Sequence, residues 1–388
     1  MSDSKILNNE NTNADQSSTV QSSIEQDNSK APTILVMAGG TGGHIFPGIA
    51  VADKLKSVGW NVHWLGTAKR MEATIVPAHG YDISFINIAG LRNKNWKEWL
   101  KTPFKLMLSV YQSVQVIRKV QPDVVLGMGG YASAPGGVAA WIMGKPLVLH
   151  EQNAVAGMSN RFLSKIASRV LSAFPGAFDE SIEHQVIGNP LRSDIIAIEN
   201  VVPHQPASSK KVLVVGGSLG AQILNTTVPQ AMKQIKLQSI DVWHQTGKGN
   251  QEAVLESYQE YGLPEEKVKV TEFIDDMAEA YKWADVVICR AGALTVSELA
   301  MAAKPAVFVP LPHAVDDHQT KNAMYLVERG AAKLIPQAEF NGTTLAQMLN
   351  TLFISDTVVQ KMAKAAHDAA HADATANVAG ICIELAKK

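Results

Sequence analysis

Short apolar runs, each followed by a glycine-containing turn, recur along this chain and predict strands that are buried on both faces. The run Ile34–Met37 is apolar and β-prone, which suits a parallel strand covered by helices on either side. It leads into Gly39–His44, and a helical pattern is expected to open at Pro47. The run Lys211–Val215 leads in the same way into Gly216–Gly220 and a second helical stretch.

The same order of elements returns in each half of the chain. A strand that starts at an aspartate runs into a short turn, a helical stretch and a Lys-Pro pair before the next strand. These residues are Asp123 and Lys145 in one half, 22 residues apart, and Asp285 and Lys304 in the other, 19 residues apart. Two such units predict two similarly wound domains with parallel sheets and right-handed crossovers.

The predicted fold class is therefore α/β, with two Rossmann-like doubly wound parallel-sheet domains that face a cleft. Ligands of such sheets bind beyond the carboxyl ends of the strands, where the glycine turns fall. Residues 1–30 contain 17 Ser, Thr, Asn or Gln and no aromatic residue, so we expect disorder there. The expected division is a polar tail over 1–31, an N-terminal domain over 32–192, a linker over 193–209, a C-terminal domain over 210–357 and a last segment over 358–388.

Composition narrows the class of protein. Among 388 residues, 46% are hydrophobic, and 35 basic residues face 36 acidic ones. This balance argues against a general nucleic-acid binder, which calls for a basic surface. The two cysteines, Cys289 and Cys382, form neither a disulfide framework nor a CxxC metal site, which favours a reducing compartment. No apolar run approaches the roughly 18 residues of a membrane-spanning helix. We therefore expect a soluble, intracellular, multidomain enzyme.

The glycine turns favour anionic ligands. A turn that opens a helix presents unpaired N–H groups and the positive end of the helix dipole, both of which attract phosphate. A single turn of this kind serves equally well as a tight connection, but four at equivalent places favour the anionic reading. The dinucleotide fingerprint GxGxxG fails after Gly40-Thr41-Gly42, and no GxxxxGK[ST] loop occurs. Dehydrogenase and NTPase functions are therefore not expected.

The sequence gives no sign of a metal site or a cofactor. No D-x-D triplet occurs, and the acidic pairs Asp275-Asp276 and Asp316-Asp317 are adjacent rather than spaced for one ligand face. The 11 histidines are scattered along the chain. An enzyme of this kind that uses a sugar nucleotide would stabilise its diphosphate leaving group with helix ends instead of a cation.

The chain resembles the MurG family of bacterial glycosyltransferases over about residues 32–386. Six motifs occur in the order expected of that family, namely Gly39–His44, Gly129–Pro135, His150–Asn153, Gly188–Arg192, Gly216–Gly220 and Ala293–Glu298. The resemblance implies a GT-B fold, in which a last helix around 358–386 crosses back to the N-terminal domain. It further implies a metal-independent, inverting transfer of N-acetylglucosamine from UDP-N-acetylglucosamine to the C4 hydroxyl of a lipid-linked muramyl-pentapeptide in peptidoglycan synthesis, without a cofactor.

The resemblance assigns the donor site mainly to the C-terminal half. Glu298 would accept hydrogen bonds from both ribose hydroxyls, although a solvated helix-face glutamate is the bland alternative. Ser218 would touch phosphate or act as an ordinary helix cap, and Arg192 would bind donor or form a structural hinge. Gln319 would contact a sugar hydroxyl, but it follows His318 where the family often has a second glutamine. The further implied donor contacts are Thr41, Gly42, Gly43, Asn153, Ile274 (through its backbone), Ala293, Leu294, Thr295, Val296 and Ser297.

The acceptor side and the chemistry are assigned to the N-terminal half. The acceptor's diphosphate would lie on Gly40, Gly43, Gly129, Gly130 and Tyr131. The C4 hydroxyl must lose a proton as it attacks, and histidine is the usual general base near neutral pH. His44 is the candidate base, with an electrophilic or merely structural role left open.

The segment 91–105 suggests contact with a membrane. It carries five basic residues against Glu98 alone, with aromatic residues between them, a pattern that suits an anionic lipid surface; a helix with a solvated basic face is the alternative. We expect peripheral attachment at the cytoplasmic face of the inner membrane, where other cell-wall enzymes are further candidate partners. Another lipid acceptor, or epimerisation of a sugar nucleotide on the same fold, remains the alternative function. The membrane candidates are Arg92, Lys94, Trp96, Lys97, Trp99, Lys101 and Lys105.

Overall fold

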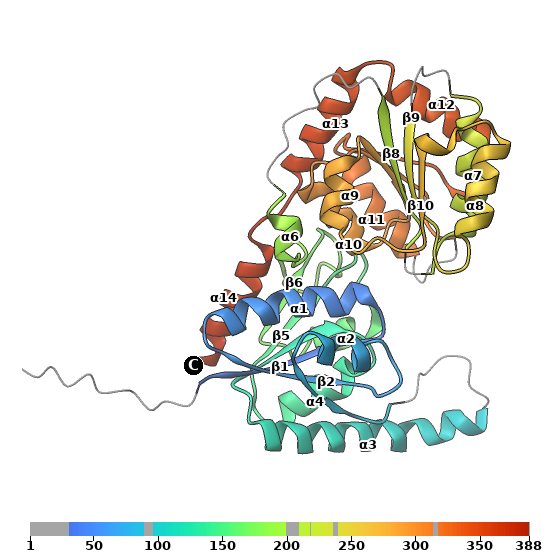
Figure 1. Ribbon diagram of the computed structural model, residues 1–388. Helices are drawn as coiled ribbons and strands as arrows, with labels where there is room; N and C mark the ends of the chain where they lie inside the picture. Colours follow the sequence, from blue (N-terminus) through green and yellow to red (C-terminus); the bar gives the residue numbers. More distant parts are fainter. Residues whose placement is uncertain are drawn as a thin grey trace, which may run out of the picture. The chain divides into compact units, whose positions relative to one another are not determined.

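The computed structural model describes residues 31–88, 96–198, 209–217, 219–235, 240–312 and 317–387, and for 96–101 the backbone alone (Figure 1). All statements below concern these residues, which apart from Ala31 belong to the compact unit Pro32–Lys388. The predicted polar tail over 1–31 lies outside them except for Ala31, as does most of the predicted linker.

The first half of the chain forms a parallel sheet of seven strands in the order β3-β2-β1-β4-β5-β6-β7. The sequence of neighbours reverses between β1 and β4, and ligands of such sheets bind beyond the strand ends at this point. The apolar run Ile34–Met37 and the strand expected to start at Asp123 correspond to β1 and β4. The strands are β1 Thr33–Ala38, β2 Asn61–Gly66, β3 Asp82–Phe85, β4 Val124–Gly129, β5 Leu147–Glu151, β6 Arg169–Ser172 and β7 Gln185–Val186.

Six helices accompany this sheet. The first begins at Gly42, so the prediction that it opens at Pro47 is wrong by five residues. The reason is local, because the N–H groups of His44 and Ile45 already donate to the Thr41 carbonyl at 3.1 and 3.2 Å. His44 therefore lies in the first turn of a helix. The helices are α1 Gly42–Ser57, α2 Glu72–Ala78, α3 Trp96–Val120, α4 Ser133–Ile142, α5 Met158–Leu163 and α6 Ser193–Ile196.

The second half repeats the arrangement with six parallel strands in the order β10-β9-β8-β11-β12-β13. The reversal falls between β8 and β11, which correspond to β1 and β4 of the first sheet. The strands are β8 Lys210–Val215, β9 Ile240–Gln245, β10 Val268–Thr271, β11 Val286–Cys289, β12 Ala306–Phe308 and β13 Ala332–Leu334. The helices are α7 Gln222–Met232, α8 Gln251–Glu260, α9 Met277–Trp283, α10 Ala293–Met301, α11 His318–Val327 and α12 Gly342–Leu352, with short 3₁₀ turns at Glu265–Lys267 and Gln337–Glu339.

The central strands are buried on both faces, as their unbroken apolar runs predict. Every residue of β1 is buried. Ile34 and Val36 point into a cluster that includes Ile49 of α1, whereas Leu35 packs with Ile117 of α3. Alternate residues of one strand thus fill two separate helix–sheet interfaces, and each large aliphatic side chain buried in this way contributes roughly 1.5–3 kcal/mol.

The chain ends in two helices where the sequence predicts a single one around 358–386. These are α13 Asp356–Asp368 and α14 Ala374–Ala386. The break follows Ala369, whose carbonyl accepts a hydrogen bond from the Tyr325 hydroxyl at 2.8 Å. Past the break, α14 lies against α1 of the first half (Figure 1), and Val378 and Cys382 join the core cluster of the N-terminal sheet.

Candidate active site

Two glycine turns meet at the carboxyl ends of β1 and β4. Gly130 has a φ of +94°, and a Cβ placed on it would overlap the backbone carbonyl of Gly39. Any residue with a side chain at position 130 would therefore be strained and would push the two turns apart. The sequence signal for these turns, two glycines after each strand, thus reflects a contact between backbones.

These turns line a cavity of about 360 Å³. The first N–H groups of α1 lie beside this cavity, where the helix dipole favours negative charge. From the C-terminal half, His318 at the start of α11 also reaches the cavity. Seven residues predicted for donor, acceptor or base roles line it together, namely Gly40, Thr41, His44, Gly129, Gly130, Tyr131 and Asn153. The predicted contacts Gly42 and Gly43 lie in the first turn of α1.

A buried carboxylate braces the first turn, and sequence reasoning missed it. Glu72 of α2 is 1% exposed. It accepts hydrogen bonds from Gly40 N at 2.9 Å, Thr67 N at 3.1 Å and Thr67 Oγ1 at 2.6 Å. Such charge-assisted bonds are about twice as strong as neutral ones. Glu72 therefore fixes the backbone that forms one wall of the cavity.

His44 contacts a short chain of polar side chains. Its Nδ1 lies 2.7 Å from Gln152 Oε1, and Gln152 Nε2 lies 3.1 Å from Nδ1 of His150. His150 is completely buried, and its Nε2 lies 2.9 Å from the Gly188 carbonyl. Burial lowers the pKa of His150 to about 4, so this ring is neutral near pH 7. Sequence inspection identified the motif 150–153 but gave Gln152 and His150 no role.

The segment after β5 is held by a second buried carboxylate. Glu151 accepts hydrogen bonds from Asn153 N at 3.0 Å, Gly157 N at 3.1 Å and Asn160 Nδ2 at 2.8 Å. Asn322 of α11 joins this segment to the C-terminal half, because its Oδ1 accepts from Ala154 N at 2.7 Å. Asn153, implied as a donor contact, thus lines the same cavity as three of the glycines that were predicted for the acceptor.

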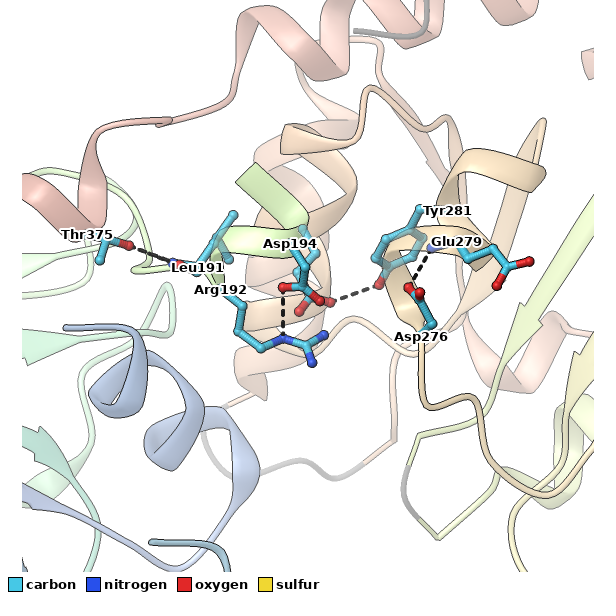
Figure 2. A network of polar contacts seen from close by, with 8 residues as sticks. Leu191, Arg192, Asp194, Asp276, Glu279, Tyr281 and Thr375 are labelled. Atoms are coloured by element: carbon cyan, nitrogen blue, oxygen red, sulfur yellow. Dashed lines mark hydrogen bonds and ion pairs between the residues drawn. The ribbon is translucent and has the colours of Figure 1, made fainter. Parts of the chain in front are cut away.

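Glu298 lies in α10 and is 8% exposed. The hydroxyl of Tyr281 donates to Glu298 Oε2 at 2.9 Å, the dashed line that starts from Tyr281 in Figure 2. Burial raises the pKa of Glu298 to about 7, against the opposing effects of the Tyr281 hydrogen bond and of the Arg192 charge. A carboxylate in such a place is a strong acceptor for paired hydroxyl donors once it is ionised.

Arg192 lies close to this carboxylate without a hydrogen bond to it. Its Nε is 3.8 Å from Asp194 Oδ1, and Figure 2 shows the two side chains next to each other. Arg192 also lines a second cavity, of about 600 Å³, between α1, α6 and the start of α14. The guanidinium lies 5.9 Å from the ring centre of Phe46. The structure therefore shows Arg192 at the junction of the two halves, which both alternatives left by the sequence require.

The start of α10 is tied to the N-terminal half by Asn189. Its Nδ2 donates to Ser297 Oγ at 3.0 Å, to the Gln152 carbonyl at 3.1 Å and to the Ala293 carbonyl at 3.3 Å. Leu294 and Thr295 are half-buried beside it, and Val296 is fully buried in the core. The predicted donor segment 293–297 is therefore a helix start that contacts the other sheet's loops.

The remaining predicted donor residues are more dispersed. Ile274 packs its side chain against the core cluster of the C-terminal half. Gln319 Oε1 accepts from Leu311 N at 2.9 Å, so its side chain supports the loop after β12. Ser218 lies outside the described residues. The helix it was expected to cap begins at Gln222, with Ala221 in the capping position.

The predicted membrane segment is only partly described. Arg92 and Lys94 lie outside the described residues, and Trp96, Lys97, Trp99 and Lys101 have a described backbone in α3 but no described side chain. Lys105 is exposed and also lines the 360 Å³ cavity. The described end of this segment therefore lies in the wall of the cavity.

Next to this cavity lies an exposed apolar surface, of which the predicted membrane segment 91–105 contains only Phe104. Phe104 is 71% exposed, Trp141 60% and Met158 63%. Of the α3 side chains that the structure describes, four of the five exposed large hydrophobic residues, all but Leu106, follow the spacing i, i+3, i+4, i+7, which in a sequence normally indicates a buried helix face. We call this the α3–α5 apolar surface, formed by Phe104, Met107, Leu108, Tyr111, Trp141, Ile142, Met158 and Phe162. Among the described residues, no helix is long and apolar enough to cross a membrane.

Comparisons with known proteins agree with this architecture. The model of the glycosyltransferase family 28 N-terminal domain matches residues 34–172, and the model of the family 28 C-terminal domain matches residues 211–378. With two parallel-sheet halves and a glycine-lined cavity, these matches define a glycosyltransferase of the GT-B fold. The predicted fold class is confirmed.

Individual relatives narrow this class. The UDP-N-acetylglucosamine--N-acetylmuramyl-(pentapeptide) pyrophosphoryl-undecaprenol N-acetylglucosamine transferase of Colwellia psychrerythraea is 59% identical over 361 residues, 92% of this chain and 93% of the relative. The protein of the same name from Aeromonas hydrophila is 54% identical over 91% of this chain and 97% of its own length. The crystal structure of Acinetobacter baumannii MurG aligns with a TM-score of 0.80 and 37% identity, over 91% of this chain and 99% of that one. The chain belongs to the MurG family of N-acetylglucosamine transferases, as its six motifs indicate.

Proposed function

We propose that this protein transfers N-acetylglucosamine from UDP-N-acetylglucosamine to the C4 hydroxyl of undecaprenyl-diphosphate-muramyl-pentapeptide, with inversion at the anomeric carbon. The observation that carries the proposal is the cavity where two glycine turns, the start of α1 and His44 come together. Backbone N–H groups at a helix start suit the acceptor's diphosphate. A histidine beside them suits a hydroxyl that has to lose its proton. The names of relatives up to 59% identical support this choice of substrates.

The donor is proposed to lie along the start of α10. Ionised Glu298 would accept the two ribose hydroxyls, and the helix start at Ala293 would face the diphosphate of UDP. The positive end of α10 favours the charge that develops there when the sugar–phosphate bond breaks. Gly216–Gly220 and the backbone of Ile274 would complete the site for phosphate and uracil.

The proposed chemistry balances within these residues. His44 Nε2 takes the proton of the acceptor's C4 hydroxyl as the oxygen attacks the anomeric carbon from the face opposite the diphosphate. The bond between that carbon and the diphosphate oxygen breaks, and UDP leaves with the electron pair. The new glycosidic bond therefore has the inverted configuration.

The same proposal places the protein at the cytoplasmic face of the inner membrane. The α3–α5 apolar surface adjoins the acceptor cavity, because Leu106 of α3 and Met158 of α5 line that cavity. An apolar surface that begins in the chain where the basic segment 91–105 ends suits an anionic bilayer, from which a polyprenyl chain would lead into the site. Replacing Phe104 and Trp141 by serine should weaken sedimentation with anionic vesicles and leave the affinity for UDP unchanged. Unaltered vesicle binding would argue against this surface as the membrane contact.

The function is tested by incubating the full chain with labelled UDP-N-acetylglucosamine and a short-chain lipid-diphosphate muramyl-pentapeptide in the presence of a chelator. We expect equal amounts of the lipid-linked disaccharide and UDP. If the donor binds and no disaccharide forms, the proposed acceptor is wrong. Conversion of the UDP-sugar into its 2-epimer without acceptor would instead support the epimerase alternative. A His44→Ala variant that keeps full turnover would remove His44 from the role of base.

A further inference from the structure

The polar chain behind His44 has a direction, and two backbone carbonyls set it. The carbonyl oxygen of Gly188 only accepts hydrogen bonds, so His150 Nε2, which lies 2.9 Å from it, carries a proton. The carbonyl oxygen of His150 lies 3.1 Å from Gln152 Nε2. Because this oxygen also only accepts, the NH₂ side of the Gln152 amide has to face His150. The amide orientation therefore follows without any assumption about a histidine tautomer.

The rest of the proton pattern follows from these two ends. With the NH₂ group turned toward His150, the amide oxygen of Gln152 faces His44 Nδ1 at 2.7 Å. His44 Nδ1 therefore has to donate. On the other side, Gln152 Nε2 lies 3.1 Å from His150 Nδ1, which accepts as long as the ring is neutral. Complete burial keeps it neutral, because it lowers the pKa of His150 to about 4.

We propose that Gln152 and His150 are positioning residues that hold the neutral His44 ring as its Nδ1–H tautomer and so leave the lone pair of Nε2 free to act as the base. The inference rests on the proposed function, in which His44 takes the acceptor's proton. Because a neutral histidine carries its proton on one nitrogen at a time, this choice decides whether the ring can remove a proton through Nε2.

The surroundings hold the ring in the same place. A Cβ at position 129 would lie 3.0 Å from His44 Cε1 and Nδ1, so the ring packs directly against the backbone of Gly129. Several other titratable side chains of the described residues share these surroundings. Lys105, Tyr131, Glu151 and His318 line the same cavity, Glu72 lies behind the glycine turn, and His150 lies behind Gln152. The contact at Nδ1 itself is a neutral amide rather than a carboxylate, so it orients the ring without adding a negative charge beside it.

The tautomer can be read directly from ¹⁵N shifts of the full chain labelled at histidine, with the His44 signals assigned by their loss in His44→Ala. At neutral pH without substrate we expect His44 to be protonated at Nδ1 and His150 at Nε2. In Gln152→Met the His44 proton should move toward Nε2, with kcat lowered about 10-fold or more and the KM for UDP-N-acetylglucosamine unchanged. A His44 that carries its proton on Nε2 in the unaltered protein would overturn the inference.

A second variant covers the case in which Gln152→Met fails to fold. Gln152→Glu keeps the size and the acceptor oxygen but adds a charge, so the acidic limb of the kcat–pH profile should move upward by roughly one unit or more. The matched control is Gln259→Glu on the exposed face of α8, which should leave the limb in place. An unshifted limb in Gln152→Glu contradicts the inference, as does full kcat in Gln152→Met. Because the nitrogen shifts need no turnover, a protein that forms no disaccharide would overturn the proposed function alone.

Discussion

The two halves of the molecule share one contact, in which an aspartate forms hydrogen bonds with both backbone groups of a residue at the start of the first strand. In the N-terminal half, Asp123 Oδ2 accepts from Thr33 N at 2.7 Å, and Asp123 N donates to the Thr33 carbonyl at 2.8 Å. In the C-terminal half, Asp285 Oδ2 accepts from Lys211 N at 2.8 Å, and Asp285 N donates to the Lys211 carbonyl at 2.9 Å. The repeated aspartate therefore joins the start of the fourth strand in each half to the start of the first strand. This explains why the repeat is visible in the sequence at all.

The halves differ at the opposite end of the same strands. The first glycine turn is braced by the buried carboxylate of Glu72 and is followed by His44. The second is braced by the neutral amide of Gln245, which binds Gly217 N and the Gly217 carbonyl, both at 3.1 Å. The shared aspartate contact aligns the two strands that carry the turns, whereas the side chains around each turn determine its charge. In the proposed function, the first turn, which lies beside the candidate base His44, holds the acceptor, and the second turn holds the diphosphate of UDP.

The largest effects should come from closing the turns themselves. Gly130→Ala places a Cβ against the Gly39 carbonyl at a φ of +94°, so we expect loss of acceptor turnover and about 1–3 kcal/mol of stability. Gly220→Ala in the other half places a Cβ against the Thr246 carbonyl and should instead weaken UDP binding. Thermal unfolding and calorimetric titration with UDP separate the two. Gly144→Ala, at φ +64° with open space around it, controls for backbone strain alone.

Removing the side-chain carboxylate of Glu298 in the C-terminal half should have the next largest effect. In Glu298→Ala the ribose hydroxyls lose their proposed acceptor, and a hydrogen bond to a charged group contributes about 1.5–3 kcal/mol. The KM for UDP-N-acetylglucosamine should rise by roughly one to two orders of magnitude, while the KM for the acceptor changes little. Steady-state kinetics with each substrate varied in turn measure this. Unaltered donor kinetics would exclude Glu298 from the ribose site and break the proposed division between the halves.

A smaller effect is expected on the pH dependence of UDP binding, which involves the C-terminal half alone. Because burial raises the pKa of Glu298 to about 7, the proposed ribose contact needs loss of a proton below that pH. UDP affinity should therefore fall by up to about tenfold per pH unit below 7 and level off above it. Tyr281→Phe removes a hydrogen bond that lowers this pKa, so the midpoint should move to higher pH. Titration calorimetry of UDP between pH 6 and 8 tests both, and a flat profile in the unaltered protein would contradict the assignment.

The same carboxyl also links pH to folding. Its proton is held more tightly in the folded chain than in the unfolded one, since burial raises its pKa from 4.5 to about 7. Its contribution to stability is therefore fully present below pH 4.5 and is lost as the pH rises through about 7. Bound UDP should offset that loss, so the shift in Tm caused by UDP should grow with pH over this range.

The sequence predicts well those features that follow from the local pattern of apolar residues. The apolar runs at 34 and 211 and the turns after them identify strands and their carboxyl ends, because a strand buried on both faces has to be apolar throughout. The break between α13 and α14 was missed; the Ala369 carbonyl at this break accepts a hydrogen bond from Tyr325, 44 residues away in the chain, and such a contact leaves no mark on the local pattern. The α3–α5 apolar surface was missed because an uncovered helix face has the same spacing as a buried one.

The polar chemistry was visible only in part. His44 and Glu298 stand out by residue type and motif, but the partners that set their proton states do not. The His150 carbonyl orients the amide of Gln152, and the Gly188 carbonyl places the proton of His150 on Nε2. Tyr281 reaches Glu298 from another helix, 17 residues away in the chain. Backbone carbonyls carry no sequence signal, so such relations appear only once the chain is folded.

The smallest effects should come from the aspartate contacts that both halves share. Asp123→Asn and Asp285→Asn each keep the shape but remove the charge that accepts the N–H of Thr33 or Lys211. We expect each to lower the free energy of unfolding by about 0.5–1.5 kcal/mol, the difference between a charged and a neutral acceptor. Chemical denaturation measures both. Similar losses would show that the aspartates serve the scaffold alike, whereas a selective loss of UDP affinity in Asp285→Asn would mean that the repeat also carries part of the division of labour between the halves.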